Sequence, residues 1–225
     1  MNEVKHWDSL QSFFSYLNEK EEYLVLRNYE ELLDRGLPDI HSDIDVLCED
    51  ADSFIDSARA VPRTKNKKDR VHQKVLIGDK YVSLDVRYVG DGYYDKNWEA
   101  EMLNRRGLTD DFCYTMDKEN YFYSLMYHAI IQKHSISDEY KARLKRMSMD
   151  MGVSADTESD YLAILQEYMR RKKYFFTYPN YPGGIANFSK VDRTLIQVDI
   201  KRILKRKIYR LKQTIKSLIR QWEKN

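Results

Sequence analysis

The sequence predicts an α/β (α+β) fold: a small mixed sheet flanked by helices and followed by a helical C-terminal part. Short apolar, β-branched runs alternate with helical patterns up to about residue 106, and only helical spacing follows. Few glycines and only four prolines argue against an all-β sandwich. We expect three parts: an α/β domain over 1–106, a helical domain over 107–190 and a long basic helix over 191–225.

Apolar spacing sets the expected elements. Three- and four-residue steps from Trp7 to Leu17 predict the first helix, Gly36 and Pro38 end the second, and Asp50 is the candidate N-cap of the third. Residues 62–69 form a basic, turn-rich loop. The expected strands are 23–26, 40–48, 71–77 and 81–88, and the expected helices are 7–21, 30–35, 51–60, 94–105, 120–134, 137–149, 159–173 and 191–222.

Composition narrows the class of protein. Charged residues make up 33% and aromatic residues 13%, which is not the composition of a disordered chain. Two cysteines provide no disulfide framework and no metal-binding spacing, so we expect a cytoplasmic protein. The first 20 residues lack the apolar stretch of a signal peptide, and no apolar run is long enough to span a membrane.

Three aspartates stand out as candidates for chemistry. Asp43 and Asp45 are two residues apart in a predicted strand, so their side chains share one face of it. Asp85 lies on the polar face of a second predicted strand. If the two strands are neighbours, three carboxylates converge and need a counter-ion, for which Mg²⁺ or Mn²⁺ is suited. The alternatives are acids that simply face water, and an Asp85 paired with Arg87 or Lys74.

The arrangement of these residues resembles a known family. A strand, a short helix, Ser-Asp-Ile-Asp at 42–45 in a second strand and Leu-Asp-Val at 84–86 are similar to the nucleotidyltransferase fold of the DNA polymerase β superfamily. The resemblance covers about residues 20–90 and implies that Asp43, Asp45 and Asp85 are catalytic and bind the divalent metals. One of them, Asp85, is also a candidate base for an attacking hydroxyl.

The sequence departs from this family after the first strand. The family usually has Gly-Ser or Gly-Gly there, where the backbone approaches the triphosphate, whereas this chain has Arg27-Asn28-Tyr29. Three interpretations remain open. Arg27 binds phosphate through its planar fork, the donor is a nucleotide-diphospho compound, or the site performs no chemistry.

The chain as a whole also resembles nucleotidyltransferase-like proteins of bacterial surface-polysaccharide gene clusters. The stretches that carry this likeness include 26–29, 41–45 and 122–128. It implies transfer of a nucleotidyl or phosphate-linked group from a nucleotide or nucleotide-activated donor to a sugar or glycan hydroxyl. The alternatives are a non-catalytic module that binds a nucleotide or a partner enzyme, and a toxin–antitoxin nucleotidyltransferase, against which the missing Gly-Ser counts.

Other polar residues near the acids are candidates for binding substrate or phosphate. Each has a structural alternative, because loop histidines are often solvated and arginines next to aspartates often form salt bridges. The candidates are Arg27, Asn28, His41, Ser42, Arg70, His72 and Arg87.

The C-terminal segment differs in charge from the rest of the chain. Residues 201–225 contain ten Lys or Arg and one acid, whereas the remaining residues contain 28 basic and 35 acidic side chains. An apolar stripe runs along the predicted helix through 200–222, which suits docking on the protein's own acidic body or on an anionic membrane surface. Like charges beside the stripe disfavour a coiled coil, and no aromatic-basic pattern of a nucleic-acid-binding module is present.

Overall fold

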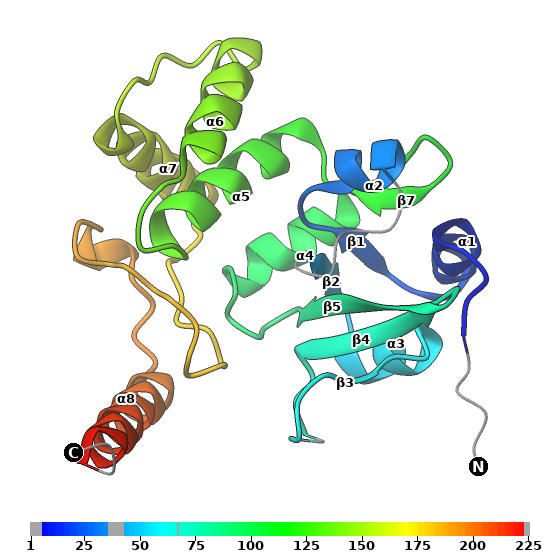
Figure 1. The fold of residues 1–225 in the computed structure, drawn as a ribbon. Coiled ribbons are helices and arrows are strands. Elements are labelled where there is room, and N and C mark those ends of the chain that lie inside the picture. Colours follow the sequence, from blue (N-terminus) through cyan, green and yellow to red (C-terminus); the bar gives the residue numbers. More distant parts are fainter. Residues whose placement is uncertain (1–5, 36–42, 67, 223–225) are drawn as a thin grey trace. The chain divides into compact units, whose positions relative to one another are not determined.

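The computed structural model describes residues 6–35, 43–66 and 68–222 (Figure 1). Of the predicted features, the helix-ending Gly36 and Pro38 and the candidates His41 and Ser42 lie outside these ranges. The chain forms two compact units. The first comprises residues 1–90 and 96–121, and the second comprises residues 91–95 and 122–225.

The first unit is built on one mixed sheet, which confirms the predicted α/β class. Among the residues that the structure describes, its seven strands have the order β3-β4-β5-β2-β1-β7-β6. The strands are β1 (Tyr23–Val25), β2 (Asp43–Cys48), β3 (Val61–Pro62), β4 (His72–Ile77), β5 (Lys80–Tyr88), β6 (Gly107–Thr109) and β7 (Cys113–Thr115). The helices of this unit are α1 (Leu10–Lys20), α2 (Tyr29–Arg35), α3 (Ala51–Ser57) and α4 (Lys96–Asn104).

The register of the central strands decides which side chains meet. Strand β2 runs parallel to β5 and antiparallel to β1, and β4 runs antiparallel to β5. The four strands expected from the sequence are confirmed within the described residues; β1, β4 and β5 have an end shifted by one residue, and positions 40–42 of the expected 40–48 strand lie outside the described ranges. Three of the described short strands were not expected: β3 begins one residue before the predicted 62–69 loop and shares only Pro62 with it, and β6 and β7 follow residue 106. With only two or three residues each, these strands show no alternation of polar and apolar residues.

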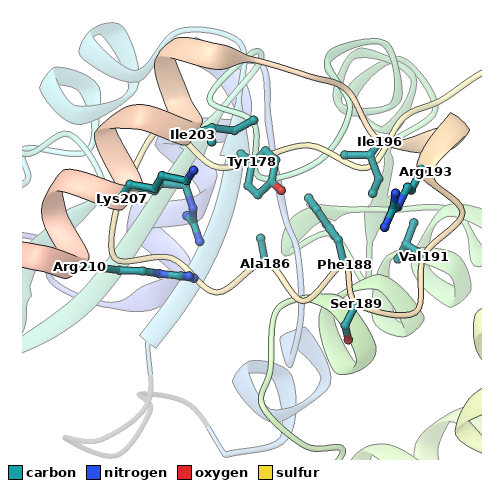
Figure 2. A pocket seen from close by; sticks show the side chains of 11 residues that line it. Tyr178, Ala186, Phe188, Ser189, Val191, Arg193, Ile196, Ile203, Lys207 and Arg210 are labelled. Atoms are coloured by element: carbon teal, nitrogen blue, oxygen red, sulfur yellow. The ribbon is translucent and has the colours of Figure 1, made fainter.

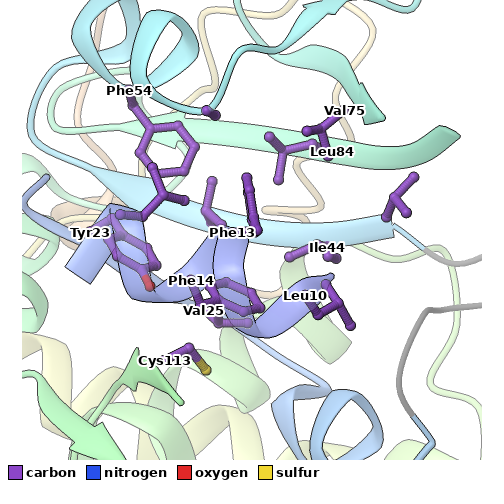
Figure 3. Packing of buried hydrophobic residues seen from close by; sticks show 14 of the residues in the cluster. Leu10, Phe13, Phe14, Tyr23, Val25, Ile44, Phe54, Val75, Leu84 and Cys113 are labelled. Atoms are coloured by element: carbon purple, nitrogen blue, oxygen red, sulfur yellow. The ribbon is translucent and has the colours of Figure 1, made fainter. Parts of the chain in front are cut away.

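The apolar face of the sheet explains why these residues fold together. Phe13, Phe14 and Leu17 of α1 and Phe54 of α3 are fully buried in a cluster against the apolar positions of β2, β4 and β5 (Figure 3). Burial of each large side chain contributes about 2–3 kcal/mol. Asp50 caps α3 by accepting a hydrogen bond from the Ser53 amide, as predicted. Because one face is occupied by this core, the polar residues that alternate with it are directed to the other face: Asp43, Asp45, Ser83, Asp85 and Arg87.

The second unit is helical, as expected, with α6 (Asp138–Asp150), α7 (Glu158–Lys172) and α8 (Ile200–Trp222); α5 (Lys118–Ile131) begins in the first unit and continues into the second. The expected helix over 191–222 is wrong at its start. Asp192 caps a single 3₁₀ turn by accepting from the Thr194 amide, and Asp199 accepts from the Arg202 amide, so α8 begins only at Ile200. Within the described residues, no helix has the length and apolar character needed to cross a bilayer.

Candidate functional site

The three aspartates lie on one face of neighbouring strands. In the parallel pair of β2 and β5, Asp45 is directly opposite Asp85 and Asp43 is opposite Ser83. One guanidinium group reaches across both strands, because Arg63 donates from Nη1 to Asp43 Oδ1 at 2.7 Å and from Nη2 to Asp85 Oδ1 at 3.1 Å. The side chain of Asp85 is therefore on the same side of the sheet as the other two carboxylates.

The carboxylate of Asp45 forms an ion pair with Arg27. Strand β1 pairs antiparallel with β2, and the Leu26 amide donates to the Asp45 carbonyl, so Arg27 follows directly beside Asp45. Its Nη2 lies 2.8 Å from Asp45 Oδ2, with 4% of the arginine side chain and 17% of the aspartate side chain exposed. Removing one partner of such a buried pair leaves an uncompensated charge, which typically costs 3–5 kcal/mol.

Asn28 belongs to the Arg27-Asn28-Tyr29 stretch, for which the family resemblance predicts Gly-Ser or Gly-Gly. Its backbone has φ 59°, in the left-handed region that glycine adopts freely and asparagine tolerates. Helix α2 begins at the next residue. The backbone conformation that glycine would supply is therefore present, although the Asn28 side chain remains in place.

Arg63 joins the cluster although the sequence alone does not single it out. It lies in the segment predicted as a basic, turn-rich loop. The structure pairs Val61 with Lys74 and Pro62 with Gln73, and the Arg63 amide donates to the His72 carbonyl at 2.9 Å. Arg63 comes one residue after an edge strand that ends near the acids. This position predicts its contact with them only when the pairing of β3 with β4 is known.

The charges in this cluster act on one another. Burial raises the pKa of the Asp85 carboxyl above its usual value, and the negative charges of Asp45 and Asp43 raise it further, while Arg87 opposes them. The Arg87 Nη2 lies 4.0 Å from Asp85 Oδ2. Since these effects disfavour the ionised form of Asp85, any added positive charge nearby stabilises that form.

The remaining candidates are divided between this cluster and other places. His72 lies opposite Asp85 in the pairing of β4 with β5, and its Nδ1 is 2.9 Å from Asp69 Oδ2. Arg70 is directed to helix α3 instead, with its Nη2 2.6 Å from Asp52 Oδ2. Lys74, the other alternative partner of Asp85, lies over the ring of Tyr81 with its Nζ 4.0 Å from the ring centroid.

The fit of a divalent cation to this cluster depends on Arg63. Three carboxylates supply the hard oxygen donors that Mg²⁺ and Mn²⁺ prefer. In the arrangement that the structure describes, however, no three His, Cys, Asp or Glu side chains within the described ranges form a metal-binding group. Guanidinium groups bind an oxygen of each aspartate, and one of these groups, Arg63, is one-third exposed. The donor chemistry fits a cation that takes the place of Arg63.

Comparisons with known proteins do not identify the chain. No protein-family model matches the sequence, and no curated protein matches it.

Proposed function

We propose that the first unit is a Mg²⁺- or Mn²⁺-dependent transferase of the nucleotidyltransferase fold. It moves a nucleotidyl or phosphate-linked group from a nucleotide or nucleotide-activated donor to a sugar or glycan hydroxyl in surface-polysaccharide synthesis. The observation that supports this most is the convergence of Asp43, Asp45 and Asp85 on one face of β2 and β5, where Arg63 reaches two of them. The resemblance of residues 42–45 and 84–86 to that superfamily supplies the reaction class.

The residues of the chain have distinct roles in this proposal. A divalent cation held by the three aspartates would neutralise charge on phosphate oxygens during in-line displacement. Arg27 keeps Asp45 in place through their buried ion pair. Asp85, whose pKa is raised by burial and by Asp45, is suited to accept the proton of the attacking hydroxyl. Arg63 is partly exposed and is suited to leave the acids and bind a phosphate of the donor.

A second candidate is a non-catalytic module of the same fold that binds a nucleotide or a partner enzyme. The observation in its favour is the balance of charge at the site. Arg27, Arg63 and Arg87 each lie within 4.0 Å of a carboxylate of the cluster, so three guanidinium groups face three carboxylates without any metal ion. Under this alternative the arginines are permanent partners of the acids.

Helix α8 supports a peripheral location at the cytoplasmic face of the inner membrane. Its apolar stripe is exposed, from 46% at Ile208 to 84% at Trp222, and the helix has nine Lys or Arg and no acid. Stripe residues follow heptad spacing, but a second copy would place Lys207 and Lys212 opposite like charges. An anionic lipid surface accepts both the apolar stripe and the flanking positive charges.

The catalytic proposal is tested with Asp43→Asn. A change at Asp45 is avoided because it would leave the buried Arg27 without its partner. Asp43 is one-third exposed and its partner Arg63 is equally exposed, so the variant leaves no charge buried. Asp79→Asn is the matched control, because Asp79 is an exposed acid in the β4–β5 turn of the same unit. Turnover is measured with a panel of nucleotides and nucleotide sugars, a glycan acceptor and Mg²⁺.

We expect turnover in the wild type and in Asp79→Asn and none in a folded Asp43→Asn. Equal turnover in all three proteins would reject the assignment. Nucleotide binding without turnover in the wild type would favour the non-catalytic module.

A further inference from the structure

The second unit contains a cavity that the proposed reaction does not use. It has a volume of about 430 Å³, within the usual range for small-molecule sites. It lies between the segment 178–196 and the first half of α8. Its lining consists of Tyr178, Ala186, Phe188, Ser189, Val191, Arg193, Ile196, Ile203, Arg206, Lys207 and Arg210.

The charged residues of this cavity are all positive. Arg206, Lys207 and Arg210 come from α8 and Arg193 from the facing segment, and no acid is among the lining residues. Figure 2 shows Lys207 and Arg210 extending from the helix on one side and Arg193 beside Val191 and Ile196 on the other. The four cations therefore surround the space from two sides.

The nearest acids in sequence are engaged elsewhere. Asp192 accepts from the Thr194 amide and lies 3.4 Å from Nη2 of Arg170. Asp199 accepts from the Arg202 amide, and its Oδ2 lies 3.2 Å from Arg202 Nε. Among the residues that the structure describes, no carboxylate lies within ion-pair distance of any cation in the cavity lining.

Arg206 is a buried cation of the cavity lining whose donors are only partly paired. The residue is only 5% exposed, and its Nη2 donates to the Gly184 carbonyl at 2.6 Å. Its Nη1 is buried and has no hydrogen-bond partner within the described part of the chain. Burial and the charge of Arg210 lower the pKa of Arg206, yet a guanidinium group remains charged in proteins. The Tyr178 ring, 5.5 Å from Arg206 Cζ, stabilises this charge in part, and an anion at the unpaired donor would stabilise it further.

We propose that this cavity binds the phosphate or diphosphate group of an organic ligand. Two positively charged sides and the forked donors of three arginines match the several oxygens of a phosphate better than a single carboxylate. The rings of Tyr178 and Phe188, with centroids 4.8 Å apart, provide an apolar wall for the organic part. A soluble nucleotide and a lipid headgroup both present this chemistry. The site is independent of the proposed reaction at the three aspartates, which lie in the other unit.

The first arm of the test uses soluble phosphates. Inorganic pyrophosphate and uridine diphosphate are titrated calorimetrically into the full-length wild type, Lys207→Gln and Arg210→Gln. Lys205→Gln is the matched control, because Lys205 is an exposed residue of the same helix that does not line the cavity. Arg146→Gln, at an exposed position of α6, is the control for arginine.

We expect each cavity variant to weaken binding about tenfold or more, the usual effect of removing one charge-assisted hydrogen bond. The two controls should bind as the wild type does. Circular dichroism establishes that every variant keeps its helix content.

The second arm uses vesicles of phosphatidylcholine with and without phosphatidic acid, sedimented in the presence and absence of pyrophosphate. Selective weakening by Lys207→Gln, together with competition by pyrophosphate, identifies a lipid phosphate as the ligand. Soluble binding without this vesicle effect identifies a free phosphate compound. The proposal is overturned if neither probe binds the wild type at millimolar concentration, or if Lys205→Gln weakens binding as much as Lys207→Gln does.

Discussion

Replacing Arg63 by glutamine should destabilise the first unit without Mg²⁺ and increase its response to Mg²⁺. The guanidinium group donates to Asp43 at 2.7 Å and to Asp85 at 3.1 Å, and these three side chains are 33%, 34% and 16% exposed. Partly exposed pairs of this kind contribute about 0.5–1 kcal/mol each. The variant should therefore lose about 1–2 kcal/mol of unfolding free energy in Mg²⁺-free buffer.

The response to Mg²⁺ then separates the two candidate functions. In the wild type a cation must displace Arg63 from the acids, whereas in the variant the oxygens are already available. Mg²⁺ at about 100 times its dissociation constant stabilises a folded protein by about 2.7 kcal/mol. If the aspartates form a metal site, this increment is larger in Arg63→Gln than in the wild type at the same Mg²⁺ concentration.

Urea unfolding followed by tryptophan fluorescence is a suitable assay. Trp7 and Trp98 are 5% and 0% exposed and both lie in the first unit, whereas Trp222 is 84% exposed and lies in the second. The unfolding signal therefore reports mainly on the unit that holds the acids. An increment from Mg²⁺ that is equal in both proteins, or absent from both, would show that the aspartates form no metal site and that the arginines are their permanent partners.

Phe14→Ala should cost about 3–5 kcal/mol of unfolding free energy, because Phe14 is fully buried in the core cluster; a urea midpoint near that of the wild type would contradict this. Since burial and Asp45 raise the pKa of Asp85, the protonated carboxyl stabilises the fold at low pH, and this contribution disappears as pH rises through the raised pKa. The free energy of unfolding of Asp85→Asn, measured with urea in Mg²⁺-free buffer, should therefore rise relative to that of the wild type from about pH 4 to pH 7. A difference between the two proteins that stays constant with pH would contradict this prediction. Leu211→Gln should reduce sedimentation with anionic vesicles because Leu211 is 62% exposed in the apolar stripe, whereas Thr214→Gln should not; equal sedimentation of both variants would reject a role for the stripe.

The sequence predicted the parts of the structure that depend on regular alternation. Polar residues at 83, 85 and 87 alternate with apolar ones, and this pattern placed Asp85 on the face of β5 opposite the core. Asp43 and Asp45 followed from the same rule in β2. The mixed sheet and the helical second part were predicted in the same way, because residues that pack in an apolar core must recur at the spacing of a strand or of a helix.

The rest depended on tertiary contacts that leave little local signal. Strand β3 has two residues, so nothing in residues 61–62 revealed that Arg63 would reach the acids. Two capping aspartates, Asp192 and Asp199, moved the start of α8 to Ile200, although the apolar pattern alone extended further. The buried Nη1 of Arg206 depends on how the 178–196 segment packs on α8, which the spacing of residues does not encode.

Titration of Mn²⁺ followed by electron paramagnetic resonance shows whether the three aspartates hold a divalent cation, because bound Mn²⁺ loses the sharp signal of the free ion. We expect stoichiometric binding by the wild type and by Asp79→Asn, and loss of this binding in folded Asp43→Asn. A wild-type protein that leaves all Mn²⁺ free at millimolar concentration, or a variant at Asp43 that binds as tightly as the wild type, would contradict this expectation.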